Sequence, residues 1–99
     1  MIKKIFVLVL LNFFLINNSY SKENFFNDAK KLFENKKYEE SKFLFQRDIV
    51  FNPKNSHAYY YLAKIFEIEE NENEAEKNLN TALLLEPGNE QALYMLIDI

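Results

Sequence analysis

The chain has 99 residues, which is room for one small domain, and it contains no cysteine, which excludes disulfide bonds and thiolate metal sites. Its formal net charge of −3 is unevenly spread: residues 22–55 carry eight Lys or Arg against six Asp or Glu, and residues 56–99 carry two against nine. The acidic second half disfavours nucleic acid, whose phosphates require a basic surface, so we expect no nucleic-acid partner.

Residues 1–21 have the pattern of a secretory signal peptide. Two lysines precede an apolar run at residues 5–16, and the polar stretch that follows has Ser19 and Ser21 at the −3 and −1 positions. We therefore expect a signal-peptide helix, cleavage after Ser21, and a mature chain in the periplasm or outside the cell. The alternative is an uncleaved anchor in the inner membrane formed by residues 5–16. Twelve helical residues span only about 18 Å, less than a hydrocarbon core of ~30 Å.

The remaining residues, 22–99, repeat with a period of 34. The two prolines, Pro53 and Pro87, are separated by this period, and each is followed two positions later by an asparagine. Self-similarity at a fixed period indicates a repeat architecture. Large and small residues recur in the same register at further positions. These positions are Phe25/Tyr59/Leu93, Ala29/Ala63, Leu32/Phe66, Ser41/Ala75, Phe45/Leu79, Ile49/Leu83 and Phe51/Leu85.

Each unit shows helical periodicity. In the second unit Tyr59, Leu62, Ala63 and Phe66 stand at i, i+3, i+4 and i+7, which forms one apolar stripe on a helix. No segment after residue 21 alternates with period 2 over any length, so the fold class is predicted to be all-α. The predicted helices cover residues 23–34, 39–51, 56–69, 73–85 and 90–98.

Polar segments and prolines mark where these helices are expected to end. The breaks Asn35-Lys36-Lys37 and Glu70-Asn71-Glu72 each contain an asparagine, a residue that tolerates the left-handed conformation ending many helices. Each proline excludes the helical conformation for the residue before it, which stops the second helix of each unit. Asn55 or Ser56 is expected to cap the third helix, and Asn89 the fifth.

Residues 22–99 resemble the tetratricopeptide repeat family. The second unit carries the family's large and small residues and its proline at the family's spacing: Tyr59, Leu62, Ala63, Phe66, Ala75, Leu79, Ala82 and Pro87. The first unit matches at Phe25, Ala29, Leu32, Ser41, Phe45 and Pro53. It departs at Asp28, where leucine is usual, and at Asp48, where a small apolar residue is usual. Lys36 and Glu70 replace the family's loop glycine.

The resemblance implies a domain at residues 22–99 built as a right-handed α-solenoid of antiparallel helix pairs. The first repeat would cover residues 22–55 and the second repeat would cover residues 56–89. The last segment, residues 90–99, would form a capping helix or the start of a truncated third repeat. The family's concave face usually binds an extended peptide or a partner helix, so the implied function is protein–protein interaction. The alternative is a structural component that self-associates into a homo-oligomer, or the front part of a longer array.

Aromatic residues recur beside the structural positions. Phe26, Tyr60 and Tyr94 follow the same period of 34, turned about 100° from the apolar stripe, and in the resembling family this position lines the groove. Lys30 and Lys64 follow one turn later on the same face, which suits a peptide with apolar side chains and a carboxylate. The alternative is that the rings fill gaps between repeats. The predicted groove residues are Phe26, Asn27, Lys30, Tyr60, Tyr61, Lys64 and Tyr94.

Residues suited to chemistry are few. His57 is the single histidine and has no nucleophile and orienting partner in the sequence pattern. There is no glycine-rich phosphate loop and no metal-ligand spacing. The acidic run at residues 67–76 lacks the central glycine of a calcium loop, so it is interpreted as solvated. We expect no catalysis, no cofactor and no metal.

The last helix is expected to end the stack. Leu93, Leu96 and Ile97 are predicted to pack back on the second unit, because a terminal helix has no further neighbour to cover it. Met95 and Ile99 are then predicted to form an exposed apolar edge.

Overall fold

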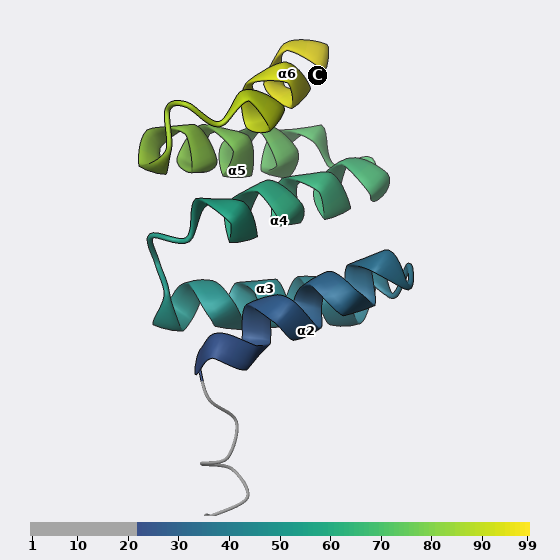
Figure 1. Cartoon of the computed structure of the whole chain (residues 1–99). Helices are drawn as coiled ribbons and strands as arrows, with labels where there is room; N and C mark the ends of the chain where they lie inside the picture. The colour runs from purple at the N-terminus through teal and green to yellow at the C-terminus, as the bar shows by residue number, and fades with distance from the viewer. Residues whose placement is uncertain (1–21) are drawn as a thin grey trace, which may run out of the picture.

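The computed structural model describes residues 22–99, and this part of the chain is all-helical, without a strand (Figure 1). Its helices are α2 (Lys22–Glu34), α3 (Tyr38–Phe51), α4 (Ser56–Ile68), α5 (Glu72–Leu85) and α6 (Glu90–Asp98). The predicted all-α class and the five predicted helices are confirmed, with every end within one residue of its expected place. The predicted signal peptide, its cleavage site and the alternative anchor lie outside the described residues.

The helices stack in chain order. Three-residue turns join α2 to α3 and α4 to α5, so each pair packs side by side with its helices antiparallel. Helix α4 also packs on α3, and α6 packs on α5, which places α2 and α3 at one end of the stack and α6 at the other (Figure 1). Among residues 22–99, no helix is long and apolar enough to cross a membrane.

Two apolar clusters hold the stack together. The first joins the α2–α3 pair to α4 through the buried side chains of Ala29, Phe45, Ala58, Leu62 and Ile65. The second joins the α4–α5 pair to α6 through Ala63, Leu79, Ala82 and Ala92. Each cluster therefore spans one helix pair and the first helix that follows it, so neither pair buries its apolar surface alone.

Small residues set the close approach within each pair. Ala29 and Ala63 are fully buried, as the repeat register predicts. In the first pair the Ser41 hydroxyl donates a hydrogen bond to the Ala29 carbonyl oxygen at 2.7 Å, and in the second pair the same position is the fully buried Ala75. A larger side chain at any of these positions would force the paired helices apart.

The turns within the two pairs have the same backbone geometry. Lys36 and Glu70 adopt left-handed conformations, with φ of 62° and 61°. In each turn the next backbone N–H reaches back along the helix, from Lys37 to the Leu32 carbonyl at 2.9 Å and from Asn71 to the Phe66 carbonyl at 2.8 Å. This is the Schellman ending, which satisfies carbonyl groups left free at a helix end.

Asparagine does not occupy the left-handed position in either turn. Asn35 precedes the left-handed residue, and Asn71 instead caps α5 by accepting a hydrogen bond from the Glu74 backbone N–H at 3.3 Å.

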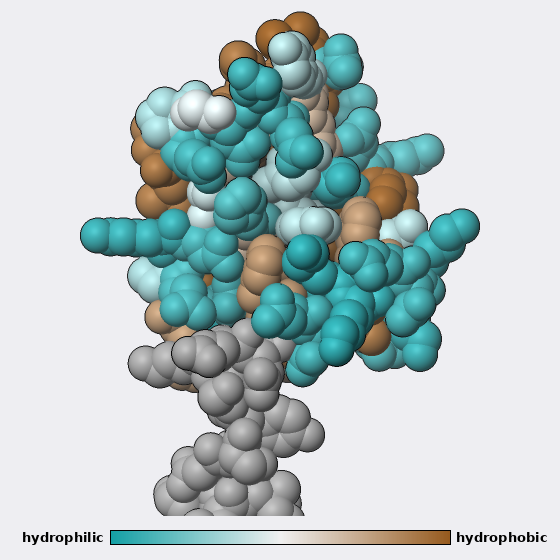
Figure 2. Space-filling model, in the orientation of Figure 1, coloured by the Kyte–Doolittle hydropathy of each residue, from teal (hydrophilic) through white to brown (hydrophobic). Residues whose placement is uncertain are grey.

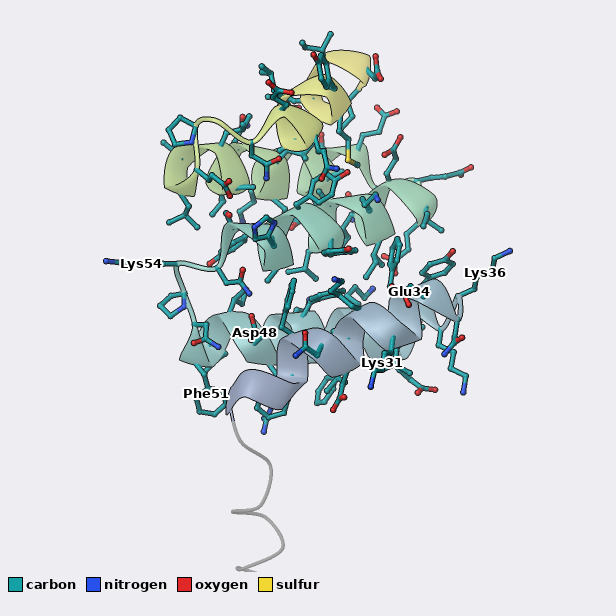
Figure 3. All side chains as sticks on the ribbon, viewed as in Figure 1. Lys31, Glu34, Lys36, Asp48, Phe51 and Lys54 are labelled. Carbon is teal, nitrogen blue, oxygen red and sulfur yellow. The ribbon has the colours of Figure 1, made fainter. Side chains whose placement is uncertain are left out.

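The buried Asp48 explains one departure from the repeat pattern. Its carboxylate is fully buried and accepts hydrogen bonds from the Asn52 side chain at 3.0 Å and from the Asn55 side chain at 2.9 Å. Figure 3 shows Asp48 on the side of α3 that faces the loop before α4. Its counterpart Ala82 makes no such bonds because its side chain has no polar atom. The carboxylate therefore fastens the connection between the two units.

Asparagine caps are confirmed at one of the two predicted helix starts. The Asn89 side chain accepts a hydrogen bond from the Ala92 backbone N–H at 3.1 Å and so caps α6. Asn55 stands at the start of α4 but makes no side-chain capping bond, because its amide group donates to Asp48 instead. The Ser56 hydroxyl donates to Glu86 at 2.6 Å, and no side chain accepts a capping bond at the start of α4. Hydrogen bonds to a carboxylate are stronger than those between neutral groups, so both side chains bond the carboxylate within reach.

Candidate partner-binding surface

The predicted groove residues come from three helices, and the structure brings most of them together. Phe26, Asn27 and Lys30 lie on α2, Tyr60, Tyr61 and Lys64 lie on α4, and Tyr94 lies on α6. Five of the seven are linked by ring contacts or by a lysine over a ring: Phe26, Lys30, Tyr60, Tyr61 and Lys64. With Phe33, these residues are called the aromatic–lysine cluster below.

Lys64 is the centre of this cluster. Its ammonium nitrogen lies 5.0 Å from the ring centre of Tyr60, 5.6 Å from that of Tyr61 and 5.5 Å from that of Phe33. A cation over aromatic faces is attracted by their negative charge density, by about 0.5–1 kcal/mol per contact at exposed sites. Because Phe33 belongs to α2 and Tyr60 to α4, the lysine joins the two helices that carry the predicted surface.

The rings also have a packing role. Tyr61 stacks on the buried Phe45 with ring centres 5.1 Å apart, and Phe26 meets the same ring edge-on at 5.7 Å. Phe26 and Tyr61 contact each other at 6.0 Å, so together they fill the space between the first pair and α4. Both rings are partly buried and keep a smaller part of their surface exposed. The cluster therefore has one edge in the core and one edge available to a partner.

Phe33 belongs to the cluster but was not predicted. Its ring contacts Tyr61 at 5.3 Å and Tyr38 at 5.4 Å, and it lies under Lys64. Its counterpart in the second unit is Glu67, so a search for repeated aromatics passes over it. Spacing within the helix would have found it, because Phe26, Lys30 and Phe33 stand at i, i+4 and i+7 on one face.

Asn27 lies apart from the cluster, on the outer side of α2. Four exposed polar residues line this side: Asn27, Asp28, Lys31 and Glu34. Figure 3 shows Lys31 on the side of α2 that faces away from α4. The counterparts on α4 are Tyr61, Leu62, Ile65 and Ile68. Leu62 and Ile65 are buried against the first pair, so Asp28 stands where leucine is usual because no described helix covers this side of α2.

Tyr94 also lies apart, at the other end of the stack. Its side chain is 63% exposed on α6, and no ring of the cluster contacts it among the described contacts. The neighbouring Ile97 is 70% exposed and Leu93 is exposed as well, whereas Met95 and Leu96 pack on the second apolar cluster. The expectation is therefore confirmed for the packed Leu96 and the exposed Ile99, and it is wrong for Leu93 and Ile97, which are exposed, and for Met95, which packs.

The same register explains which side of α6 is covered. Met95 and Leu96 are the counterparts of Tyr61 and Leu62, so they face the preceding pair. Ile97 is the counterpart of the buried Ala63, which contacts the second helix of its own pair. No described residue forms a second helix beside α6, and Ile97 is left uncovered.

His57 lies in a polar contact between α4 and the loop before α6. Its Nε2 atom is 3.8 Å from the Glu86 Oε2 atom, and the Ser56 hydroxyl donates to that same oxygen at 2.6 Å. The hydroxyl is thus bonded to a carboxylate and not to the imidazole, which differs from a nucleophile activated by histidine. Among the described residues, no group of three acids or histidines is placed to hold a metal ion.

No protein-family model and no curated protein sequence matches the chain. The interpretation of the site therefore depends on its own residues.

Proposed function

We propose that residues 22–99 are a tetratricopeptide-type α-solenoid of two repeats and a following helix, and that this domain binds a peptide or a partner protein without catalysing a reaction. The support for the solenoid is the sequence period of 34, together with two antiparallel pairs whose helices are joined by turns of the same geometry. The repeat boundaries proposed are residues 22–55 and 56–89, with residues 90–99 as the last helix.

The observation that carries the binding proposal is the position of Lys64 over three rings. Partly buried aromatic rings with an accessible edge beside a cation offer apolar contact and a positive charge to the same ligand. Lys30 repeats the arrangement over Phe26, at 5.8 Å from its ring centre. A ligand that suits both is a peptide segment, extended or helical, with large apolar side chains next to an Asp or Glu. Nucleic acid is disfavoured by the acidic second half.

A peptide array tests this proposal. The probes are ten-residue peptides that combine Leu or Phe with Asp or Glu, each paired with a version that has Asn or Gln instead. We expect the full chain to bind acidic peptides over their amide versions, Tyr60→Ala to lose binding, and Lys64→Gln to lose the acidic preference. The matched control Lys77→Gln removes an exposed lysine of α5 and should bind like the parent.

Binding must be separated from folding in this test. Tyr60→Ala and Lys64→Gln should keep the helical circular dichroism of the parent. Lys64→Gln should keep nearly the parent's melting temperature, and Tyr60→Ala should lower it only modestly, because Tyr60 packs at the edge of the second apolar cluster and is partly exposed. Equal binding by parent and variants, or no acidic preference in the parent, would contradict the proposed site. A parallel loss of binding and stability would assign Tyr60 to packing alone.

We also propose that the domain works in the periplasm or outside the cell, after cleavage behind Ser21. The support is the signal-peptide pattern of residues 1–21. The intact mass of protein recovered from expression in an export-competent bacterium tests it, since a chain beginning at Lys22 is expected. A membrane-bound species that keeps Met1 would favour the anchor at residues 5–16.

A second candidate function is assembly, either by self-association or as the front part of a longer array. The observation that favours it is the exposed apolar side of α6, where Leu93, Tyr94 and Ile97 are uncovered. Exposed apolar patches on a soluble domain commonly mark a surface that another protein covers.

A further inference from the structure

The uncovered side of α6 corresponds to the side on which α2 and α4 each contact the second helix of their pair. Ala29 and Ala63 occupy one register position in α2 and α4, and each is fully buried beside the second helix of its pair. Ile97 occupies that position in α6 and is 70% exposed. Figure 2 shows hydrophobic surface at the top of the view, where α6 lies in Figure 1. A helix with an apolar face is the element that covers this position elsewhere in the chain.

Helix α3 carries an exposed apolar face that suits this place. Phe43, Arg47 and Val50 stand at i, i+4 and i+7, and Phe43 is 59% and Val50 72% exposed. The Arg47 guanidinium lies 5.9 Å from the Phe43 ring centre, so its charge stays beside the apolar stripe. These three residues are called the α3 stripe below.

A hollow beside the stripe adds to the apolar surface. It has a volume of about 430 Å³ and is lined by Leu32, Glu39, Glu40, Phe43 and Leu44. This volume accommodates a leucine, isoleucine or tyrosine side chain. The two acids of the lining belong to the first turn of α3, at the end away from Arg47 and Lys54.

The charges of the two faces are complementary at one end of the contact. The chain has no Lys or Arg after Lys77, and α6 with the loop before it contains Glu86, Glu90 and Asp98. Arg47 stands on the α3 stripe, and Lys54 follows the end of α3. If the two helices run antiparallel, as they do in both pairs, the bases of α3 lie toward Glu86 and Glu90. The acids Glu39 and Glu40 of α3 then lie toward Asp98, so the favourable charge pairing is confined to one end of the contact. Opposite charges around an apolar contact favour the correct partner and its orientation.

A second α6 is a poorer occupant than α3. Two α6 helices would bring acids together without a base to pair with them, and like charges at close range cost free energy. The α3 stripe and α6 lie at opposite ends of the stack (Figure 1), so one molecule cannot cover its own α6 with its own α3. An α3 stripe that covers α6 therefore belongs to another copy of the chain.

We propose that the chain self-associates head to tail, with the α3 stripe of one copy covering the uncovered side of α6 in the next. This deepens the assembly candidate and does not depend on peptide binding by the aromatic–lysine cluster. Such a contact joins two different faces, so it continues into an open chain or closes into a ring. Added salt should weaken the charged part of the contact, because exposed charges are screened.

Mixing two single variants tests the head-to-tail contact. Val50→Asp disables the α3 stripe and leaves α6 intact, and Ile97→Asp does the reverse. Sedimentation velocity of the full chain should show assemblies that grow with concentration, and each variant alone should match the double variant, which sets the background. An equimolar mixture of the two single variants should form a one-to-one dimer and no larger species.

A matched control and the opposing outcomes complete the test. Leu84 is the counterpart of Val50 on α5 and is 83% exposed, so Leu84→Asp should assemble like the parent. The proposal is wrong if the parent sediments like the double variant, or if the mixture stays monomeric. It is also wrong if Val50→Asp alone still dimerises while Ile97→Asp does not, which would indicate contact between two α6 helices. Both single variants should bind the array peptides like the parent, so loss of assembly is distinguishable from loss of peptide binding.

Discussion

Helices α2 and α4 occupy the same place in successive units, yet their outer sides differ in kind. Asp28 is exposed on α2, and its counterpart Leu62 is 1% exposed on α4, because α4 has the first pair beneath it and α2 has no described helix there. Helix α6 repeats the apolar pattern of α4 on that side and so packs on the second pair. The register of a repeat therefore fixes which way a residue faces, and the neighbours decide whether it is buried.

The largest effect should come from exchanging residues across this register. Leu62→Asp places a charge in the first apolar cluster and removes a buried leucine, which should lower the free energy of unfolding by more than about 3 kcal/mol. Asp28→Leu changes an exposed position and should change the free energy of unfolding by no more than ~0.5 kcal/mol. Urea unfolding followed by circular dichroism measures both. Equal losses would show that the outer side of α2 is covered in the native protein.

The next effect concerns the small residues inside the pairs. Ala63→Leu and Ala75→Leu should each cost ~1–3 kcal/mol, because the paired helices leave no room for a larger side chain. Ile97→Leu, at the register position of Ala63 but exposed, serves as the control and should not change the melting temperature. If both alanine variants melt like the parent, the packing of the pairs is contradicted.

An effect of similar size is expected at the connection between the units. Asp48→Ala introduces the residue that the second unit has at Ala82, yet it should destabilise the chain by about 1–3 kcal/mol, because an unmatched polar group that stays partly buried carries that cost. The groups left unmatched are the Asn52 and Asn55 amides, which lose their acceptor. Thermal unfolding measures the loss. Unchanged or higher stability would mean that water replaces the carboxylate at no cost.

The smallest effect concerns the two left-handed turn residues. Lys36→Gly and Glu70→Gly should each stabilise the chain by about 0.5–1 kcal/mol, because glycine adopts positive φ without the steric cost that other residues incur, less its larger loss of backbone entropy. The two gains should be similar, since the turns have the same φ and hydrogen bonds. Asn35→Gly, one residue earlier at a helix end, is the control and should not stabilise. If both glycine variants were less stable than the parent, the contacts of the Lys36 and Glu70 side chains would contribute more free energy than their left-handed backbone costs.

The helices could be predicted from the sequence because prolines and apolar spacing are local features, which the period of 34 repeats in the second unit. Sequence reasoning also placed Phe26, Tyr60 and Lys64 on one surface, since one helix face and one register determine that. It failed at Ile97, because a period of 34 gives orientation and not the presence of a neighbour. It failed at Asn55, because the buried Asp48 earlier in the chain competes for the side chain. Phe33 was not predicted as a member of this surface because its counterpart in the second unit is not aromatic.

The hydrogen bonds of Asp48 also bear on how the stack responds to force. In a repeat protein each unit touches only its neighbours, so tension along the stack is carried through each junction in turn. At the first junction the Asp48 carboxylate accepts hydrogen bonds from Asn52 and Asn55, which lie on either side of Pro53 in the connecting loop. At the second junction Ala82 cannot accept such bonds, and the Glu86 carboxylate instead accepts a hydrogen bond from the Ser56 hydroxyl. We therefore expect a stretched molecule to yield first at α6, with the two hairpins moving as one stiff body.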